Sequence, residues 1–198
     1  MEIIFLTCLA YILGSVPCGL LLAKAFASED ITAKGSGNIG ATNVRRVAGN
    51  LPGFLTLAGD MMKGAIPVYL ALSLTDPDGM RSQICIALVS LAAFTGHLYP
   101  LFMKFQKGGK GVATAAGCFL VISPSALVIA MLAFIMVVWL TRRVSAGSLA
   151  AATALPLAVW ISLGSEIMTG CALIIAVLIC HRHKDNIRRL ANGTEPRV

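Results

Sequence analysis

Seven apolar segments joined by short polar loops constrain the fold of this chain more than any other feature. They cover residues 3–26, 53–74, 82–103, 111–122, 125–141, 147–163 and 166–181. A helix needs about 20 apolar residues to cross a bilayer, so the first three segments are long enough and the last four are short. Only 13% of the 198 residues are charged, against about 25% in soluble domains. These features predict one all-α, polytopic membrane domain over residues 1–198, with seven transmembrane helices.

The apolar stretch from Val112 to Thr141 is too long for a single membrane span. As one helix it would extend for about 45 Å, whereas the hydrocarbon core is about 30 Å thick. Pro124 lies near its middle, and proline ends a helix because it lacks an N–H. Basic residues flank both ends of the stretch, so both ends are expected in the cytoplasm, with two short helices between them.

The distribution of basic residues predicts the orientation of the chain. If the N-terminus lies outside, Arg81 is in an outer loop, Lys63 is within a helix, and the other fourteen of the sixteen Lys and Arg are cytoplasmic. An excess of positive charge in cytoplasmic loops is typical of membrane proteins. The C-terminus is then cytoplasmic. The net charge of +7 comes without a long basic arm or an aromatic platform, so the lipid bilayer is an expected partner and nucleic acid is not.

Two charged residues, Asp60 and Lys63, lie three positions apart on one face of the second segment. Charges inside a spanning helix are costly, and they are usually paired or functional. Two interpretations stay open for them: a self-neutralising pair that packs the bundle, or a group that lines a site. Of the six cysteines, nearly all lie in apolar runs, where cysteine behaves as a small hydrophobic residue. Cys180 and the neighbouring histidines lack a second ligand group, so no zinc is expected.

Four polar clusters fall on the predicted cytoplasmic side. The first runs from Lys34 to Arg46, and its glycines can turn backbone N–H groups toward an anion. In the second, from Gly96 to Thr114, a glycine–lysine run opens into a helix, whose N-terminus favours anions. Lys104 stands where a Walker loop needs glycine, so ATP is not implied. The third is the basic turn 142–148, and the fourth is the tail segment 181–190.

Each cluster also has a plainer interpretation. The first could be a basic loop attracted to anionic lipid. His97 in the second could tie a helix end to a carbonyl instead of acting as a base or a phosphate donor. Capping explains Ser145 or Ser148 in the third. In the fourth, His183 and Asn186 share a helix face, although this tail could equally lie on the membrane surface.

The strings SGNIGATNVRR and GHLYPLFMKFQKGGKGVAT, with residues 142–148 and the tail around Asn186, resemble the bacterial acyl-phosphate:glycerol-3-phosphate acyltransferases of the PlsY type. The resemblance covers essentially the whole chain, with a departure at Gln106-Lys107. It implies an inner-membrane enzyme that transfers a fatty acyl group from acyl phosphate to the 1-position of glycerol 3-phosphate. The products would be lysophosphatidic acid and phosphate, at an active site facing the cytoplasm. It implies no cofactor and no metal, and a monomer is expected.

The chemistry requires cations and backbone donors that hold two phosphates and an oxyanion. Catalytic roles are expected for Ser36, Arg45, Lys110, His183 and Asn186. Substrate-binding roles are expected for Gly37, Asn38, Gly40, Ala41, Thr42, Asn43, His97, Lys107, Gly108, Gly109, Gly111, Arg142, Arg143, Ser145 and Ser148.

Three groups of residues have different expected partners. Ser36 and the amides from Gly37 to Ala41 are assigned to the acyl-phosphate head group. Lys110 and Arg45 are assigned to phosphate and oxyanion. The residues assigned to glycerol 3-phosphate are Ser148, His183 and Asn186.

The proton acceptor is left open between the donor phosphate, His97 and His183. An acyl-enzyme on Ser36 is a further option, but no adjacent His or Asp supports a triad. A membrane transporter of organic phosphates is the alternative function. It would need polar or broken helices near the midplane and a route to both faces.

Overall fold

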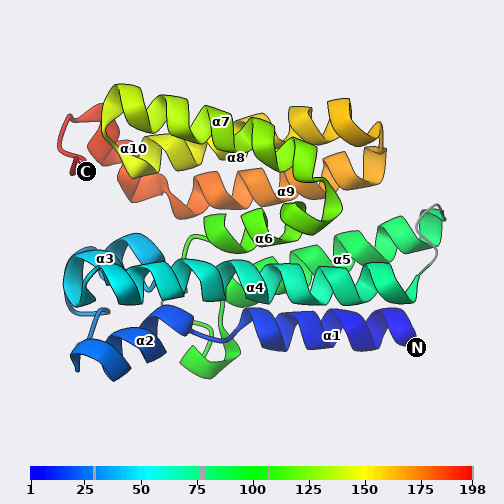
Figure 1. Cartoon of the computed structure of the whole chain (residues 1–198), viewed down its shortest axis with the longest axis horizontal. Helices are drawn as coiled ribbons and strands as arrows, with labels where there is room; N and C mark the ends of the chain where they lie inside the picture. The colour runs from blue at the N-terminus through cyan, green and yellow to red at the C-terminus, as the bar shows by residue number, and fades with distance from the viewer. Residues whose placement is uncertain (29, 76–78, 107, 198) are drawn as a thin grey trace. The chain divides into compact units, whose positions relative to one another are not determined.

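The computed structural model describes residues 1–28, 30–75, 79–106 and 108–197, and their regular structure is entirely helical. The helices, in chain order, are α1 (Glu2–Gly14), α2 (Cys18–Ala27), α3 (Ala41–Ala48), α4 (Asn50–Leu74), α5 (Met80–Leu98), the 3₁₀ helix η1 (Leu101–Met103), α6 (Val112–Ile122), α7 (Pro124–Thr141), α8 (Val144–Leu163), α9 (Glu166–Arg182) and α10 (Lys184–Ala191) (Figure 1). They form two compact units, Met1–Val121 and Ile122–Val198, which are described separately. The all-α prediction is confirmed, while the prediction of one domain stays untested.

Within the described residues, four stretches are long and apolar enough to cross a membrane. They are Glu2–Ala27, Met80–Met103, Pro124–Thr141 and Val144–Leu163. A fifth appears when α9 and α10, bent by 61°, are taken as one span, and α6 is a shorter apolar helix. Large apolar side chains on α7, such as Trp139 and Leu140, are exposed, as expected for a surface that faces lipid. Seven spans and the orientation of the termini stay predictions.

The first apolar segment forms two helices, whereas the sequence analysis drew it as one. α1 ends at Gly14 and α2 begins at Cys18, directly after Pro17. Proline has no N–H to continue the helical ladder. At the break between the two helices, the carbonyl oxygen of Val16 accepts bonds from the amide of Cys18 at 3.0 Å and from the Nζ of Lys63 at 2.9 Å. A side chain of α4 thus helps to satisfy the backbone where the helix is broken.

Close packing of small residues holds the helices of the first unit together. A Cβ on Gly14 would overlap the carbonyl of Ala93, and one on Gly96 would overlap the carbonyl of Tyr11, so α1 and α5 approach backbone to backbone. A Cβ on Gly117 of α6 would likewise overlap a carbonyl of α4. Small residues at helix crossings are the usual means of packing helices in lipid, where burial of apolar surface gives little driving force.

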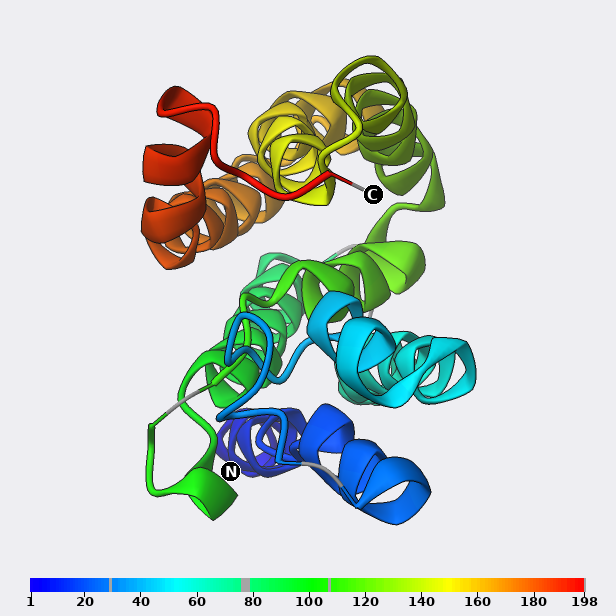
Figure 2. The same ribbon diagram turned by 90° about the vertical axis from the view of Figure 1, so that its left-hand side faces the viewer.

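The loop before α3 and the loop that contains η1 both lie toward the end of the first unit that is away from the N-terminus (Figures 1 and 2). Ile31, Ile39 and Val44, from the first loop and α3, form a buried apolar cluster. Met103 of η1 packs against that cluster. The first two polar clusters of the sequence therefore share one end of this unit.

The second unit consists of α7, α8, α9 and α10. Ser123 caps α7, because its hydroxyl accepts a bond from the amide of Ala126 at 3.3 Å, and Pro124 occupies the first turn. This confirms the predicted break. The C-terminal tail runs from α10 back to the start of α8, so the third and fourth polar clusters meet at one end of this unit (Figure 2).

Candidate functional site

Asn43, in the first turn of α3, shapes the first glycine-rich loop. Its side chain is buried, and its Nδ2 group faces the carbonyls of Ile31 (3.1 Å), Lys34 (3.2 Å) and Asn38 (2.9 Å). Its Oδ1 atom accepts a bond from the amide of Ser36 at 2.8 Å. One side-chain amide thus folds twelve residues of chain into a fixed loop. A contact between Asn43 and substrate stays a prediction.

Several amides of this loop donate to groups of the protein itself. The amide of Gly40 donates to Oδ1 of Asn38 at 2.8 Å, and that of Gly37 donates to the carbonyl of Lys34 at 3.1 Å. Gly37 also has a positive φ of 69°, which a glycine adopts without strain. These bonds order the loop. Because the amides of Gly37 and Gly40 already donate within it, the amides at the start of α3 are the better candidates to bind an anion.

Ser36 and Arg45 border this loop, and both side chains are exposed. Arg45 lies on α3, where a Cβ on Gly53 of α4 would overlap its stem. Its guanidinium offers a planar fork of donors that matches phosphate. The structure therefore places a hydroxyl and a cation beside a loop whose backbone is already held in place.

The second glycine segment, Gly108 to Gly111, lies flat against the last turns of α5. A Cβ on Gly108 would overlap the carbonyl of Leu98, and one on Gly109 would overlap the His97 ring. Gly111, with a positive φ of 83°, faces the ring of Phe94 in the same way. Close packing against α5 is by itself enough to require glycine at these three positions. Lys110 is half-buried among them, and Lys107 lies outside the described residues.

Glu195, in the C-terminal tail, organises the polar end of the second unit. It is 8% exposed, and its Oε1 accepts bonds from Ser145 Oγ and Asn186 Nδ2, both at 2.6 Å. Its Oε2 accepts a bond from Arg189 Nε at 2.6 Å. Arg143 adds a bond to the carbonyl of Gly193 at 3.3 Å. The tail is thereby tied to both α8 and α10.

The hydrogen bonds at Glu195 decide its charge state. Burial raises the pKa of this carboxyl, but bonds from Ser145, Asn186 and Arg189, together with the charge of Arg189, outweigh that effect. The pKa of Glu195 is therefore lowered below its ordinary value of 4.5. A charged carboxylate accepts stronger hydrogen bonds than a neutral acid does. At neutral pH Glu195 is an anion held among donors.

His183 and Ser148 flank this cluster. His183 is buried at the junction of α9 and α10, and its Nδ1 lies 2.8 Å from the carbonyl of Ile179. A carbonyl only accepts, so Nδ1 carries the proton and the lone pair of the neutral ring is on Nε2. Ser148 donates to the carbonyl of Val144 in its own helix at 2.9 Å. Arg142, at the turn before α8, is exposed.

The structure gathers the candidate residues into two groups, one in each unit. The first group joins the loop of Ser36 with α3, and has the Gly108–Gly111 segment at the same end of its unit. The second joins Ser145 with Asn186 through Glu195. The sequence analysis missed Glu195, although it is a carboxylate in a strongly basic tail. Among the described residues, no three His, Cys, Asp or Glu side chains gather to hold a metal ion.

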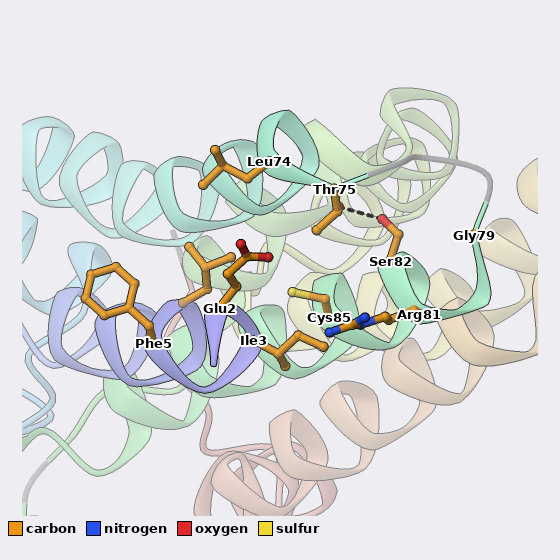
Figure 3. Close-up of a pocket in the computed structure, with 10 residues that line it drawn as sticks. Glu2, Ile3, Phe5, Leu74, Thr75, Gly79, Arg81, Ser82 and Cys85 are labelled. Carbon is orange, nitrogen blue, oxygen red and sulfur yellow. Dashed lines mark hydrogen bonds between the residues drawn. The ribbon is translucent and has the colours of Figure 1, made fainter.

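A pocket of about 450 Å³ opens at the other end of the first unit (Figure 3). Residues of α1, α4 and α5 line it, among them Glu2, Phe5, Leu74 and Arg81. It is far along the helices from both glycine segments (Figure 1). The candidate site is therefore assigned to the loops, where hydroxyl and basic side chains gather, and not to this pocket.

The fold defines an all-helical integral membrane protein in which glycine, hydroxyl and basic residues gather at the loops. Over residues 4–193 the chain matches the family model described as glycerol-3-phosphate acyltransferase. A glycerol-3-phosphate acyltransferase of Geobacter sulfurreducens is 50% identical over 196 residues, which are 98% of this chain and 96% of the relative. One from Syntrophotalea carbinolica is 47% identical over 188 residues, with 95% and 93% covered. The chain belongs to the glycerol-3-phosphate acyltransferase family.

Solved structures agree with this assignment. The crystal structure of PlsY, an integral membrane glycerol 3-phosphate acyltransferase, in its glycerol 3-phosphate form superimposes with a TM-score of 0.93 at 36% identity. That match covers 100% of this chain and 96% of the other. The lysophosphatidic acid form of PlsY gives a TM-score of 0.91, with 100% and 95% covered. The resemblance seen in the sequence is confirmed.

Proposed function

We propose that this chain transfers a fatty acyl group from acyl phosphate to the 1-position of glycerol 3-phosphate, giving lysophosphatidic acid and phosphate. The observation that carries the proposal is the full-length similarity to PlsY in its glycerol 3-phosphate form. Family membership favours a transferase over the alternative, a transporter of organic phosphates. We further propose seven spans, an outer N-terminus, a site at the cytoplasmic face of the inner membrane, and a monomer.

The reaction exchanges one carbon–oxygen bond for another. The glycerol hydroxyl oxygen attacks the carbonyl carbon of the mixed anhydride, and an ester bond forms. The bond between that carbon and the phosphate oxygen breaks, and phosphate leaves with the electron pair. The hydroxyl proton passes to the departing phosphate or to a nearby base. Negative charge develops on the carbonyl oxygen, and preorganised cations and donors are the most effective means to stabilise it.

The first unit supplies the groups for the acyl phosphate in this proposal. Ser36 and the first amides of α3, at Ala41 and Thr42, bind the head group, because the amides of Gly37 and Gly40 donate within the loop. Arg45 and Lys110 neutralise phosphate and the developing oxyanion. Lysine offers phosphate a compact positive charge, and arginine offers it a planar fork of donors.

The second unit supplies the groups for glycerol 3-phosphate. Arg142 and Arg143 face its phosphate, while Ser148, His183 and Asn186 orient its hydroxyls. Asn186 also donates to Glu195, which fixes the direction of its amide. His183 donates from Nδ1 to the carbonyl of Ile179, so its Nε2 is the ring nitrogen that could accept a hydroxyl proton. His183 and the donor phosphate remain the two candidate bases.

His97 is withdrawn as a candidate base in this proposal. It is 3% exposed, and its Nε2 atom abuts Gly109 so closely that a Cβ there would overlap it. A general base must come within hydrogen-bond reach of the proton that it takes. His97 packs against Gly109, so its contacts indicate a structural role beside the glycine segment.

Phosphate release from purified protein tests the donor and the acceptor together. Palmitoyl phosphate with glycerol 3-phosphate should release phosphate and form lysophosphatidic acid, and palmitoyl-CoA should not replace the donor. Reaction with palmitoyl-CoA alone would contradict the proposed donor. Uptake of glycerol 3-phosphate into liposomes that hold the protein, without acyl transfer, would support the transporter instead.

Matched variants test the residue roles. Lys110→Ala should lower phosphate release at least a hundredfold, while Lys104→Ala, an exposed lysine of the same segment, should stay within twofold of the unmodified protein. Asn186→Ala should also abolish release, with the exposed Asn192→Ala as its control. Full activity of Asn186→Ala would refute its assigned role. Incubation with radiolabelled acyl phosphate alone shows whether a stable acyl-enzyme forms on Ser36.

A further inference from the structure

A charged pair is buried in the middle of α4. Asp60 is 2% exposed and Lys63 is 6% exposed, and Lys63 Nζ lies 2.9 Å from Asp60 Oδ1. Removing two charges from water is expensive, and their mutual attraction seldom repays the cost in full. Charged groups within membrane helices usually mark a function. A pair that only packs helices could be replaced by apolar side chains at little cost.

One end of this pair is fixed to the break between α1 and α2. Lys63 Nζ donates to the carbonyl of Val16 at 2.9 Å, in the stretch that Pro17 frees from helical bonding. Lys63 is therefore held from two sides, by a carboxylate of its own helix and by a carbonyl of the stretch between α1 and α2. The ion pair with Lys63 in turn orients the carboxylate of Asp60.

The other end of the pair faces α5. His97 Nδ1 lies 3.6 Å from Asp60 Oδ1, an ion-pair distance longer than a hydrogen bond. His97 is 3% exposed, so little water competes for the contact. A carboxylate beside one ring nitrogen favours the proton on that nitrogen and fixes the orientation of the ring. Asp60 thereby sets how the imidazole of His97 lies.

His97 in turn holds the glycine segment at two points. Its backbone carbonyl accepts a bond from the amide of Gly109 at 3.2 Å. Its Nε2 lies so close to the Cα of Gly109 that a Cβ there would overlap it. A turn of the ring would push Gly109 away and break that contact. Lys110, the next residue, would move with it.

We propose that Asp60 and Lys63 are positioning residues, which act through His97 to fix Gly108–Gly111 and the head group of Lys110. The role in catalysis rests on the function proposed above, because Lys110 serves there as a cation for phosphate. The pair lies within α4, outside both glycine segments. The Asp60 carboxylate orients the His97 ring, and His97 in turn contacts the Gly108–Gly111 segment.

A neutral double variant separates this role from simple packing. Asp60→Asn with Lys63→Met removes both charges and keeps the volume, so it leaves no unpaired buried charge and should melt within about 3 °C of the unmodified protein. If the pair only packs the bundle, activity is also kept. If it positions the loop, kcat/KM for acyl transfer falls at least tenfold. Thr56→Val, which removes a buried hydroxyl that donates to the carbonyl of Pro52 in α4, is the control and should keep full activity.

Hydrogen exchange provides a readout that needs no activity and no double variant. In Asp60→Asn, and in the double variant, peptides that contain Gly109 should exchange at least fivefold faster, while peptides of α9 should not change. In Lys63→Arg, which keeps the cation, exchange should stay close to that of the unmodified protein. Unchanged exchange around Gly109 in Asp60→Asn would overturn the proposal, and so would a double variant within twofold of full activity. If the unmodified protein shows no acyl transfer, the proposed function fails, but the exchange result still decides this inference.

Discussion

Replacing Glu195 with alanine should destabilise the second unit by a predictable amount. The change leaves Ser145 Oγ and Asn186 Nδ2, which both donate to Glu195 at 2.6 Å, without that acceptor in a buried place. A buried donor that loses its partner costs about 1–3 kcal/mol. Arg189 is 39% exposed, so its share is about 0–1 kcal/mol because water replaces the lost contact. The loss should be at least about 2 kcal/mol, or about 4–8 °C in melting temperature for a chain of this size.

The measurement is thermal unfolding in detergent, followed with a maleimide dye that reacts with buried cysteines such as Cys171 as they become exposed. Glu195→Gln should fall between alanine and the unmodified protein, since its amide oxygen still accepts one bond. Glu166→Ala removes an exposed carboxylate at the other end of the unit and serves as the control. A Glu195→Ala melting temperature within about 1 °C of the unmodified protein would refute the view that the tail anchors α8 to α10.

Three further predictions concern charge, packing and topology. Because the folded pKa of Glu195 is lowered, its stabilisation is present above its ordinary pKa of 4.5 and is lost as pH falls through the lowered value. The gap in melting temperature to Glu195→Gln should therefore be constant above about pH 5 and shrink below it. Gly117→Val should cost about 1–3 kcal/mol by overpacking, measured as melting temperature against Gly170→Ala, where the added Cβ meets open space. Cysteines at Lys34 and Arg81 should react with an impermeant thiol label from opposite sides of the membrane, and labelling from one side only would contradict the topology.

The sequence predicted one helix break and missed another, although both involve a proline. Ser123 and Pro124 stand between two apolar runs that together exceed a bilayer, so length alone required the break. Pro17 stands within a segment of acceptable length, so length gave no warning. At the break the carbonyl of Val16 accepts a bond from Lys63, which belongs to another helix. Such a contact is a property of tertiary structure, which periodicity does not report.

The clustering of the candidate residues was predictable from the sequence, but the hydrogen bonds that each side chain makes were not. Glycine, hydroxyl and basic residues cluster in the sequence, and the fold places each pair of clusters at one end of a unit. Asn43 was expected to contact substrate, yet its amide satisfies four backbone groups of its own loop. Sequence composition shows that an amide is present, whereas only the folded chain shows what it bonds.

A division of labour follows from the cost of leaving polar groups unpaired. Loops at a membrane surface must satisfy their own backbone, and neutral amides such as Asn43 do this well because they donate and accept at once. Arg45 is exposed beside the loop, and its planar fork of donors suits it to meeting phosphate. Substitution of Arg45 should therefore weaken activity in a salt-dependent way and leave melting temperature nearly unchanged. Substitution of a loop amide should lower both, because the loop must be folded before its cations are in place.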